Sequence, residues 1–426
     1  MTSILVLCAW LLGAAPQTVA PGEVIADIRV HGNHLTEDAE VIRLSGLTKG
    51  APVTADTVSG ALKRLNDSGK FDDAEVLKRF ASIDDPTQIL IMLIVNDGPV
   101  KIEVPVGPNA VGARPRIVSR GLVGRLMYLP IIDGEDGYAV RFGLRVAYVP
   151  SAKSKSRLSF PLTWGGERRA GVEWEKGFDH GRLQFGGALT SSEHPFYQVK
   201  DARRRTWARA EVSLANIHVG ATGSLQGIHF GNTRDTVRTI GADVTVDTRL
   251  DPAMPRNALY LFARAESVRI APDGTQGSAA FAVDRMRTKV DVSGYLGTFR
   301  QTVLVARVLR EDISASAPPY FKAMLGGMSN LRGFEAGQFI GDTVVAGTVE
   351  IRTPITSPVS VGKVGIRAFV DAGTAYDKGQ RYKDQTLKQG YGAGLFFTAA
   401  IFHMNLDVAH GKGAGTRVHF GGGFSF

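Results

Sequence analysis

"YAVRFGLRVAYV", residues 138–149, alternates between large apolar residues and polar or small ones without a break. One set shares the odd positions of the stretch: Tyr138, Val140, Phe142, Leu144, Val146 and Tyr148. The other set contains Ala139, Arg141, Gly143 and Arg145. Because successive side chains of a β-strand point to opposite faces, this stretch predicts a strand with one apolar and one polar surface.

The same period of two continues to the end of the chain. "FHMNLDVAH", residues 402–410, and "TRVHFGGGFSF", residues 416–426, again separate an apolar face from a polar or small one. Strands that cross a membrane need about 9 to 11 residues, and they must close into a barrel because an open edge in lipid exposes unpaired backbone groups. The sequence has room for about sixteen strands, at roughly 18 residues for each strand and its turn. We therefore predict a mainly β fold, with an antiparallel transmembrane β-barrel over residues 137–426.

Alternation is also typical of a soluble β-sandwich or β-propeller, so other features must decide between them. The first 20 residues, "MTSILVLCAWLLGAAPQTVA", contain an apolar run and a small-residue site, and they predict a secretory signal peptide over residues 1–20. A lipid anchor on Cys8 is disfavoured, because "LVLC" lacks the small residues of a lipobox and comes too early. No comparable apolar run follows, and the chain ends on Phe426 within an alternating strand. These features favour the membrane barrel.

Composition narrows the possible functions. Cys8 is the only cysteine, so the mature chain would contain no disulfide, no thiolate nucleophile and no cysteine-based zinc site. The net charge of +9 comes from dispersed Lys and Arg residues without a basic block, so we expect no nucleic acid partner. The glycine runs "GYGAG" at Gly390 and "GKGAG" at Gly411 precede no helical pattern and predict barrel glycines rather than phosphate loops.

No motif of a hydrolase is present, since the sequence contains neither GxSxG nor HExxH. His403, His410 and His419 lie near one another in the sequence, but His403 and His410 have opposite parity and point to opposite faces of a strand. We therefore predict no catalytic residues, no metal site, no cofactor and no small-molecule substrate.

Residues 24–99 mix two periods. "VIADIRV" alternates like a strand, "TEDAEVIRLSG" and "TADTVSGALKRLNDSG" have a helical period, and "FDDAEVLKRF" and "TQILIMLIVNDGP" are typical of strands. Together they predict a compact α+β domain over residues 24–99. Residues 100–136 fit neither pattern and form either a linker or early barrel strands.

The segment "PYFKAMLGGMSNLRGFEAGQFIGDTVVAGTVEIRTPI" resembles the bacterial surface antigen barrels of the BamA and TamA family, which are outer-membrane assembly factors. In that family an LRGF motif lies on a long loop that folds back into the barrel; here the motif is Leu331, Arg332, Gly333 and Phe334. "FVDAG" resembles the inner-wall motif that receives the arginine, with Phe369, Asp371 and Gly373. The planar guanidinium of arginine suits a carboxylate, so the resemblance implies that Arg332 pairs with Asp371 in the lumen.

Three further segments extend the resemblance over nearly the whole mature chain. Residues 24–99 resemble a POTRA domain, the periplasmic module of these proteins. "VDTRLDPAMPRNALYLFARAE" resembles a family hairpin, although Leu250 and Asp251 replace the usual Asp and Asn. The terminal "VHFGGGFSF" resembles the closing strand that the assembly machinery reads as a signal, here carried by Phe420, Phe424 and Phe426.

The resemblance implies an assembly, insertion or translocation factor that acts through a barrel seam and a POTRA domain. It also implies an outer membrane of the Gram-negative type, with the POTRA domain in the periplasm. The expected partners are outer-membrane lipids and client or accessory proteins of the periplasm and outer membrane. Two alternatives stay open because central family members carry several POTRA domains: a passive channel or structural barrel without insertase activity, and a dedicated protein-secretion pore.

Overall fold

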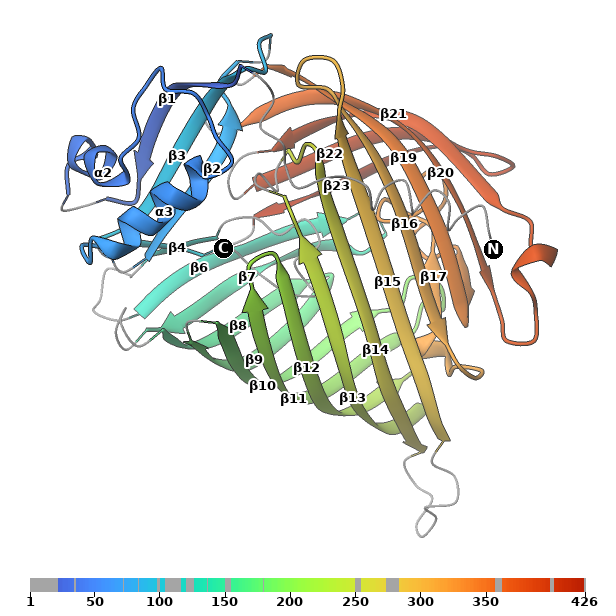
Figure 1. Ribbon diagram of the computed structural model, residues 1–426. Coiled ribbons are helices and arrows are strands. Elements are labelled where there is room, and N and C mark those ends of the chain that lie inside the picture. The colour runs from blue at the N-terminus through green and yellow to red at the C-terminus, as the bar shows by residue number, and fades with distance from the viewer. Residues whose placement is uncertain are drawn as a thin grey trace.

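A small helix–strand unit lies beside one end of a wide β-barrel (Figure 1). The computed structural model describes residues 22–33, 36–71, 73–82, 84–97, 100–103, 116–119, 126–135, 137–149, 155–178, 180–249, 254–272, 283–356, 362–398 and 402–424. The predicted signal peptide and Phe426 lie outside these residues, as do Leu250 and Asp251 of the hairpin. Within the described ranges, no helix is both long enough and apolar enough to span a membrane.

The N-terminal unit is a three-stranded sheet covered by two helices, as the sequence predicted. Its elements are β1 (Val24–His31), α2 (Asp38–Ser45), α3 (Thr57–Asp67), β2 (Asp73–Phe80) and β3 (Gln88–Asn96). β3 is the central strand, parallel to β1 and antiparallel to β2. Alternate residues of the strands, such as Ile25, Ile89 and Ile91, pack against Val41 of α2 and Leu65 of α3, all at most 1% exposed. This burial gives the unit a core of its own.

Sixteen antiparallel strands form a closed barrel in which β23 returns to β6. The strands are β6 (Leu126–Glu135), β7 (Ala139–Tyr148), β8 (Ser156–Gly165), β9 (Glu167–Phe178), β10 (Gly181–Glu193), β11 (Lys200–Leu214), β12 (Ile217–Phe230), β13 (Thr233–Asp247), β14 (Ala258–Pro272), β15 (Val283–Gly297), β16 (Val303–Ile313), β19 (Thr343–Thr356), β20 (Lys363–Tyr376), β21 (Lys388–Thr398), β22 (Phe402–Gly411) and β23 (Gly415–Phe424). The predicted barrel of about sixteen strands is thus confirmed. Its first strand, β6, lies in the stretch that the sequence left between linker and early barrel strands. Two short pairs lie outside the barrel sheet: β4 (Val100–Glu103) with β5 (Arg116–Ser119), and β17 (Ala323–Leu325) with β18 (Phe339–Gly341).

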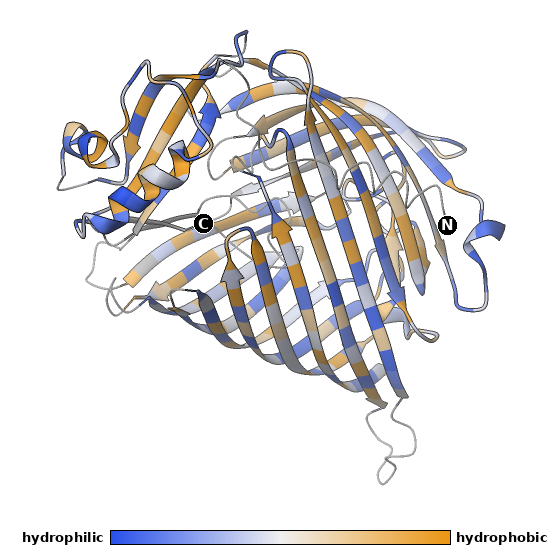
Figure 2. Cartoon of the chain, viewed as in Figure 1, coloured by the Kyte–Doolittle hydropathy of each residue, from blue (hydrophilic) through white to orange (hydrophobic). Residues whose placement is uncertain are grey.

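The apolar face of each strand points outward. Val140 and Phe142 on β7 are 54% and 53% exposed, and Val418 on β23 is 62% exposed. Their neighbours of opposite parity point inward, and Asp407 and His419 are fully buried there. Figure 2 shows the resulting alternation of hydrophobic and hydrophilic residues along β12 to β16. An apolar exterior around a polar interior is the arrangement of a transmembrane barrel and the reverse of a soluble sandwich.

The barrel closes through a short seam, defined here as the pairing of β6 with β23. Four residue pairs join these strands, from Gly421 opposite Glu135 to Phe424 opposite Ile132. By contrast, ten pairs join β6 to β7 and ten join β22 to β23. Within the described residues, the first half of β6, which contains Pro130, has no partner on β23. Proline removes a backbone donor and is confined to strand edges, so the composition of β6 suits an edge that is only partly paired.

The N-terminal unit contacts the barrel at one set of turns. Arg300, in the turn between β15 and β16, forms an ion pair of 2.7 Å with Asp84. The Arg256 guanidinium lies 5.2 Å from the ring centroid of Phe80. Because the strands alternate in direction, the connections after β10, β12 and β16 lie at the opposite end of the barrel.

Candidate functional site

The connection between β16 and β19 folds back into the barrel and carries the LRGF motif. It contains the short helix η3 (Pro319–Phe321) and the β17–β18 pair. At its tip, the Gly327 N–H donates to the Phe334 carbonyl at 3.1 Å, and the Leu331 N–H donates to the Gly327 carbonyl at 3.2 Å. Gly333 has a φ of 90°, a conformation that side-chain-bearing residues rarely adopt. This turn aims Arg332, which is only 5% exposed, at the inner wall.

Arg332 meets Asp371 on β20 in a two-pronged contact. Its Nε donates to Asp371 Oδ2 at 2.8 Å, and its Nη2 donates to Oδ1 at 2.8 Å. The backbone N–H of Arg332 also donates to Oδ2 at 3.0 Å. The guanidinium carbon lies 3.3 Å from the ring centroid of Phe369, two residues earlier on the same face of β20. The structure therefore brings Arg332, Phe369 and Asp371 together through charge-assisted hydrogen bonds and a cation–π contact.

Two further carboxylates belong to this cluster. Arg332 Nη1 donates to Glu350 Oε2 on β19 at 2.7 Å, and it lies 3.3 Å from Asp407 Oδ2 on β22. Arg367 binds both oxygens of Asp407, at 2.7 and 2.6 Å, and Arg352 binds Glu350 at 2.5 Å. We call these six residues the lumen network: Arg332, Arg352, Arg367, Glu350, Asp371 and Asp407. Its three positive and three negative charges balance, which a buried ionic cluster requires.

Sequence reasoning proposed Asp371 as the partner of Arg332 and missed the roles of Glu350 and Asp407. The one signal available for these two residues was their position on the polar face of an alternating strand. Asp407 occupies the polar face of "FHMNLDVAH", and Glu350 follows the motif on the next strand. Alternation shows that a side chain points into the lumen, but it does not give the position of that side chain along the barrel axis. It therefore cannot identify contacts between strands that are distant in the sequence.

Apolar residues of the motif hold the loop beside the network. Leu331 and Phe334 are 0% and 2% exposed and pack with Leu325 and Val344. The ring of Phe334 lies 5.4 Å from that of Phe339 in an edge-to-face arrangement. Gly373 lies beneath this cluster, where an added Cβ would approach Leu325 Cδ1 to 3.0 Å.

Glycines of β21 and β22 form the surface on which the motif rests, which we call the glycine floor: Gly390, Gly392, Gly394 and Gly411. A Cβ on Gly390 would lie 1.9 Å from the Arg332 carbonyl oxygen, and one on Gly411 would lie 2.4 Å from the Gly333 carbonyl oxygen. A Cβ on Gly392 would meet the Phe369 ring at 2.9 Å, and one on Gly394 would meet Asp407 Oδ1 at 2.0 Å. The "GYGAG" run therefore has glycine at each inward position because the loop, the Phe369 ring, Asp407 and the backbone of β22 occupy the space of a side chain.

Gly390→Ala should lower the free energy of unfolding by about 1–3 kcal/mol, because the new methyl group displaces the backbone of Arg332 from the wall. The measurement is a urea titration in detergent micelles, scored by the fraction of protein that keeps the folded mobility on unheated SDS gels. Gly347→Ala is the matched control, since its Cβ would meet only the Arg307 carbonyl oxygen at 3.7 Å. Equal midpoints for the two variants would show that the glycine floor is not needed.

A second anchor holds the loop on the far wall. The Tyr320 hydroxyl donates to Asp235 on β13, and Arg203 Nη2 on β11 donates to the Tyr320 carbonyl at 3.2 Å. At the base of the loop, Asp342 accepts from the Ala317 N–H at 2.8 Å and from the Lys378 N–H at 3.0 Å. The loop thus crosses the lumen and is fixed to both walls. No sequence pattern predicted the Tyr320 contact.

The remaining predicted residues lie near the seam. Phe420 points outward and is 44% exposed. Phe424 forms the last backbone pairs of β23, with Phe402 and Ile132. That these aromatic residues act as an assembly signal stays a prediction. Within the described residues, no group of His, Cys, Asp and Glu side chains is arranged to hold a metal ion.

Two protein-family models match the chain. The model of the Omp85 superfamily domain matches residues 140–426, and the model of the surface antigen variable number repeat, a POTRA domain, matches residues 23–96. Among solved structures, BamA from Haemophilus ducreyi lacking POTRA domains 1–3 is similar, with a TM-score of 0.57, 13% identity, and coverage of 95% of this chain and 85% of that chain. CdiB from Escherichia coli aligns with a TM-score of 0.50 and 12% identity, over 97% of this chain and 93% of that chain. No curated protein matches the sequence.

The structural similarities rest on low identity and show the fold. The Omp85 model, in contrast, covers more than half of the chain, and that family comprises outer-membrane insertases and transporters rather than enzymes. Together with the closed sixteen-stranded barrel and the N-terminal α+β unit, this match leads to one conclusion. The chain is an outer-membrane protein with a POTRA domain at residues 23–96, and it belongs to the Omp85 superfamily.

Proposed function

We propose that this protein inserts or translocates client proteins by opening its barrel seam toward the membrane. The observation that carries this proposal is the seam itself, where four residue pairs hold β6 and β23 together. The first half of β6 has no β23 partner among the described residues, and its backbone groups are ones to which a client strand can add by β-augmentation. Burial of the client's apolar strand face in lipid is favourable, so the reaction needs no nucleotide.

The N-terminal unit supplies a second edge. In its sheet, β1 and β2 are the outer strands, and either can accept a client or accessory strand. We propose that this unit lies in the periplasm and delivers clients to the adjacent barrel turns, where Arg300 and Arg256 contact it. Insertion itself takes place at the seam, so it does not depend on this contact.

The loop across the lumen argues against a passive channel. It is fixed to β20 through Arg332 and to β13 through Tyr320, so it obstructs the space that solutes would cross. Solute flow would require both anchors to release, whereas opening of the seam leaves them in place.

Depletion of the protein followed by proteomics of the outer membrane tests the proposal. We expect the levels of several other outer-membrane barrels to fall, with no early change in small-solute uptake. Loss of one secreted protein alone would assign a dedicated secretion pore. Altered solute permeability with an unchanged outer-membrane proteome would contradict the proposal and favour a channel.

A further inference from the structure

Four arginines point away from the lumen on three alternate strands, and we call them the arginine patch: Arg168 on β9, Arg204 on β11, and Arg234 and Arg238 on β13. All are exposed on the outward face. Directly opposed residues form rows across the strands: Arg168 and Arg234 share one row, Arg204 lies in the next, and Arg238 in the third. With strands about 4.8 Å apart, the patch spans about 19 Å from β9 to β13.

The arginine patch differs from many arginines of the lumen, which pair with carboxylates of the chain itself. Arg209, for example, pairs with Asp243 at 2.6 Å, and Arg307 pairs with Asp291 at 2.7 Å. Within the described part of the chain, no ion pair involves a member of the patch. Outside the patch, the outward-facing Arg269 and Arg310 have acids at 3.9 and 3.7 Å. In the next row toward the loops, Glu193 lies opposite Lys200, so this pair adds no net charge to the surface beside the patch.

The height of the patch on the barrel identifies what it faces. It borders the connections after β10 and β12, at the end of the barrel opposite the POTRA contact. The row directly below it is apolar, with Trp174, Phe185 and Ile240 at 37%, 47% and 71% exposed. The patch therefore lies where the hydrocarbon belt ends, at the headgroups of the outer leaflet. An unpaired guanidinium at that depth is stable when a headgroup supplies the opposite charge.

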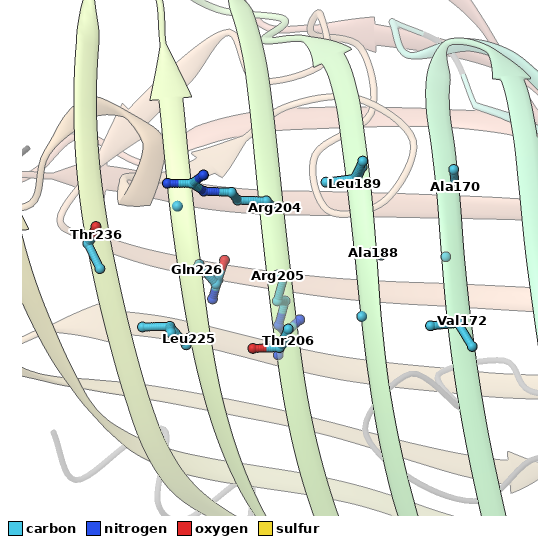
Figure 3. A pocket seen from close by; sticks show the side chains of 13 residues that line it. Ala170, Val172, Ala188, Leu189, Arg204, Arg205, Thr206, Leu225, Gln226 and Thr236 are labelled. Atoms are coloured by element: carbon cyan, nitrogen blue, oxygen red, sulfur yellow. The ribbon is translucent and has the colours of Figure 1, made fainter.

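An apolar groove of about 610 Å³ opens directly beneath Arg204 on the same outer surface. Its floor is low because Ala170, Gly187 and Gly227 have little or no side chain, and Leu189 and Leu225 border it. Figure 3 shows the Arg204 side chain extending from its own strand across the neighbouring strand that carries Leu225 and Gln226. The groove thus combines a surface for acyl chains with a cation at its edge.

We propose that the arginine patch and the adjacent groove bind an outer-leaflet lipid whose headgroup carries two phosphates. Arg204 and Arg238 contact one phosphate, and Arg234, four residues before Arg238 on β13, contacts the second. Arg168 adds positive charge on the other side of Arg204. The width of the patch exceeds that of a single phosphate, and the groove accepts the acyl chains. Bidentate guanidinium contacts make arginine well suited to this recognition.

Native mass spectrometry of the full-length protein in detergent tests this site. The probe is an acylated glucosamine disaccharide with two phosphates, compared with its dephosphorylated form and with inorganic pyrophosphate. We expect retention of the bisphosphorylated lipid to fall on the order of tenfold in Arg204→Gln/Arg238→Gln, as loss of two charge-assisted contacts implies. Gly187→Val should also weaken retention, because the new side chain fills the groove while the arginines stay intact. The substitution should be tolerated, since a Cβ at this position would lie 3.7 Å from Thr206 Cγ2, an ordinary contact distance.

Arg310→Gln is the matched control, since Arg310 also faces outward but has Asp312 beside it. It should retain the lipid as the unmodified protein does. Heat-modifiable mobility on SDS gels verifies that each variant has folded. Equal retention by the double variant and the control would overturn the proposal. So would equal binding of the dephosphorylated lipid, or competition by pyrophosphate at the lipid's own concentration, since the acyl groove would then contribute nothing.

Discussion

Arg332→Ala is expected to lower the free energy of unfolding by about 3–5 kcal/mol, the range typical of removing one partner from a buried ion pair. The substitution leaves Glu350, Asp371 and Asp407 with two arginines instead of three, at positions that are at most 3% exposed. The loop also loses its attachment to β20. A guanidinium titration in detergent micelles measures the change, and limited proteolysis at the loop reports whether it has left the lumen.

Arg332→Lys distinguishes charge from shape. Lysine restores the positive charge but cannot contact both oxygens of Asp371 while reaching Glu350, so we expect an intermediate loss of stability. Arg381→Ala is the control, because Arg381 forms an exposed loop pair with Asp384, and such pairs contribute about 0–1 kcal/mol. If Arg332→Ala is no more destabilising than this control, the lumen network does not hold the loop.

The period of two was enough to predict the barrel, because each of its strands has to separate lipid from lumen. Val140 and Phe142 face outward, and Asp407 and His419 face inward, as their alternation requires. The contact of Arg332 with Asp371 followed from a resemblance of motifs rather than from periodicity. Glycine on the inner face of a barrel leaves space in the lumen, but the sequence did not say what fills the space beside "GYGAG". In the structure, the backbone of Arg332 lies against Gly390.

Contacts that depend on height and register lay beyond the sequence. A polar residue on an inward face can meet any loop that enters the lumen, so the Tyr320 hydroxyl could not be assigned to Asp235 in advance. The start of the barrel was also open. β6 contains Pro130 and pairs weakly at the seam, so it lacks the clear alternation of a strand that is paired on both sides. Local sequence therefore specified the faces of the strands, whereas tertiary geometry specified the partners.

A disulfide across the seam should abolish client insertion while leaving the folded barrel intact. Gly134 on β6 and Gly422 on β23 are directly opposed and both lie on the outward face. Among the described residues, only four residue pairs join the two strands. A covalent bond at this point therefore prevents a separation that backbone hydrogen bonds alone would oppose weakly. In cells whose only copy is Gly134→Cys/Gly422→Cys, we expect outer-membrane barrels to fall to the level seen on depletion. Reduction of the disulfide should restore them.

The control for this experiment is a disulfide between two strands in the opposite wall of the barrel. Ala221 on β12 and Ala242 on β13 are also directly opposed and outward-facing, but fourteen residue pairs join their strands. Ala221→Cys/Ala242→Cys should therefore form a disulfide without any effect on client levels, because these strands have no need to separate. The only native cysteine, Cys8, lies in the predicted signal peptide and would not compete for either bond. Normal client levels with an oxidised seam would mean that clients cross without lateral opening, and the mechanism would have to be sought in the lumen, where release of Arg332 from Asp371 would become the required step.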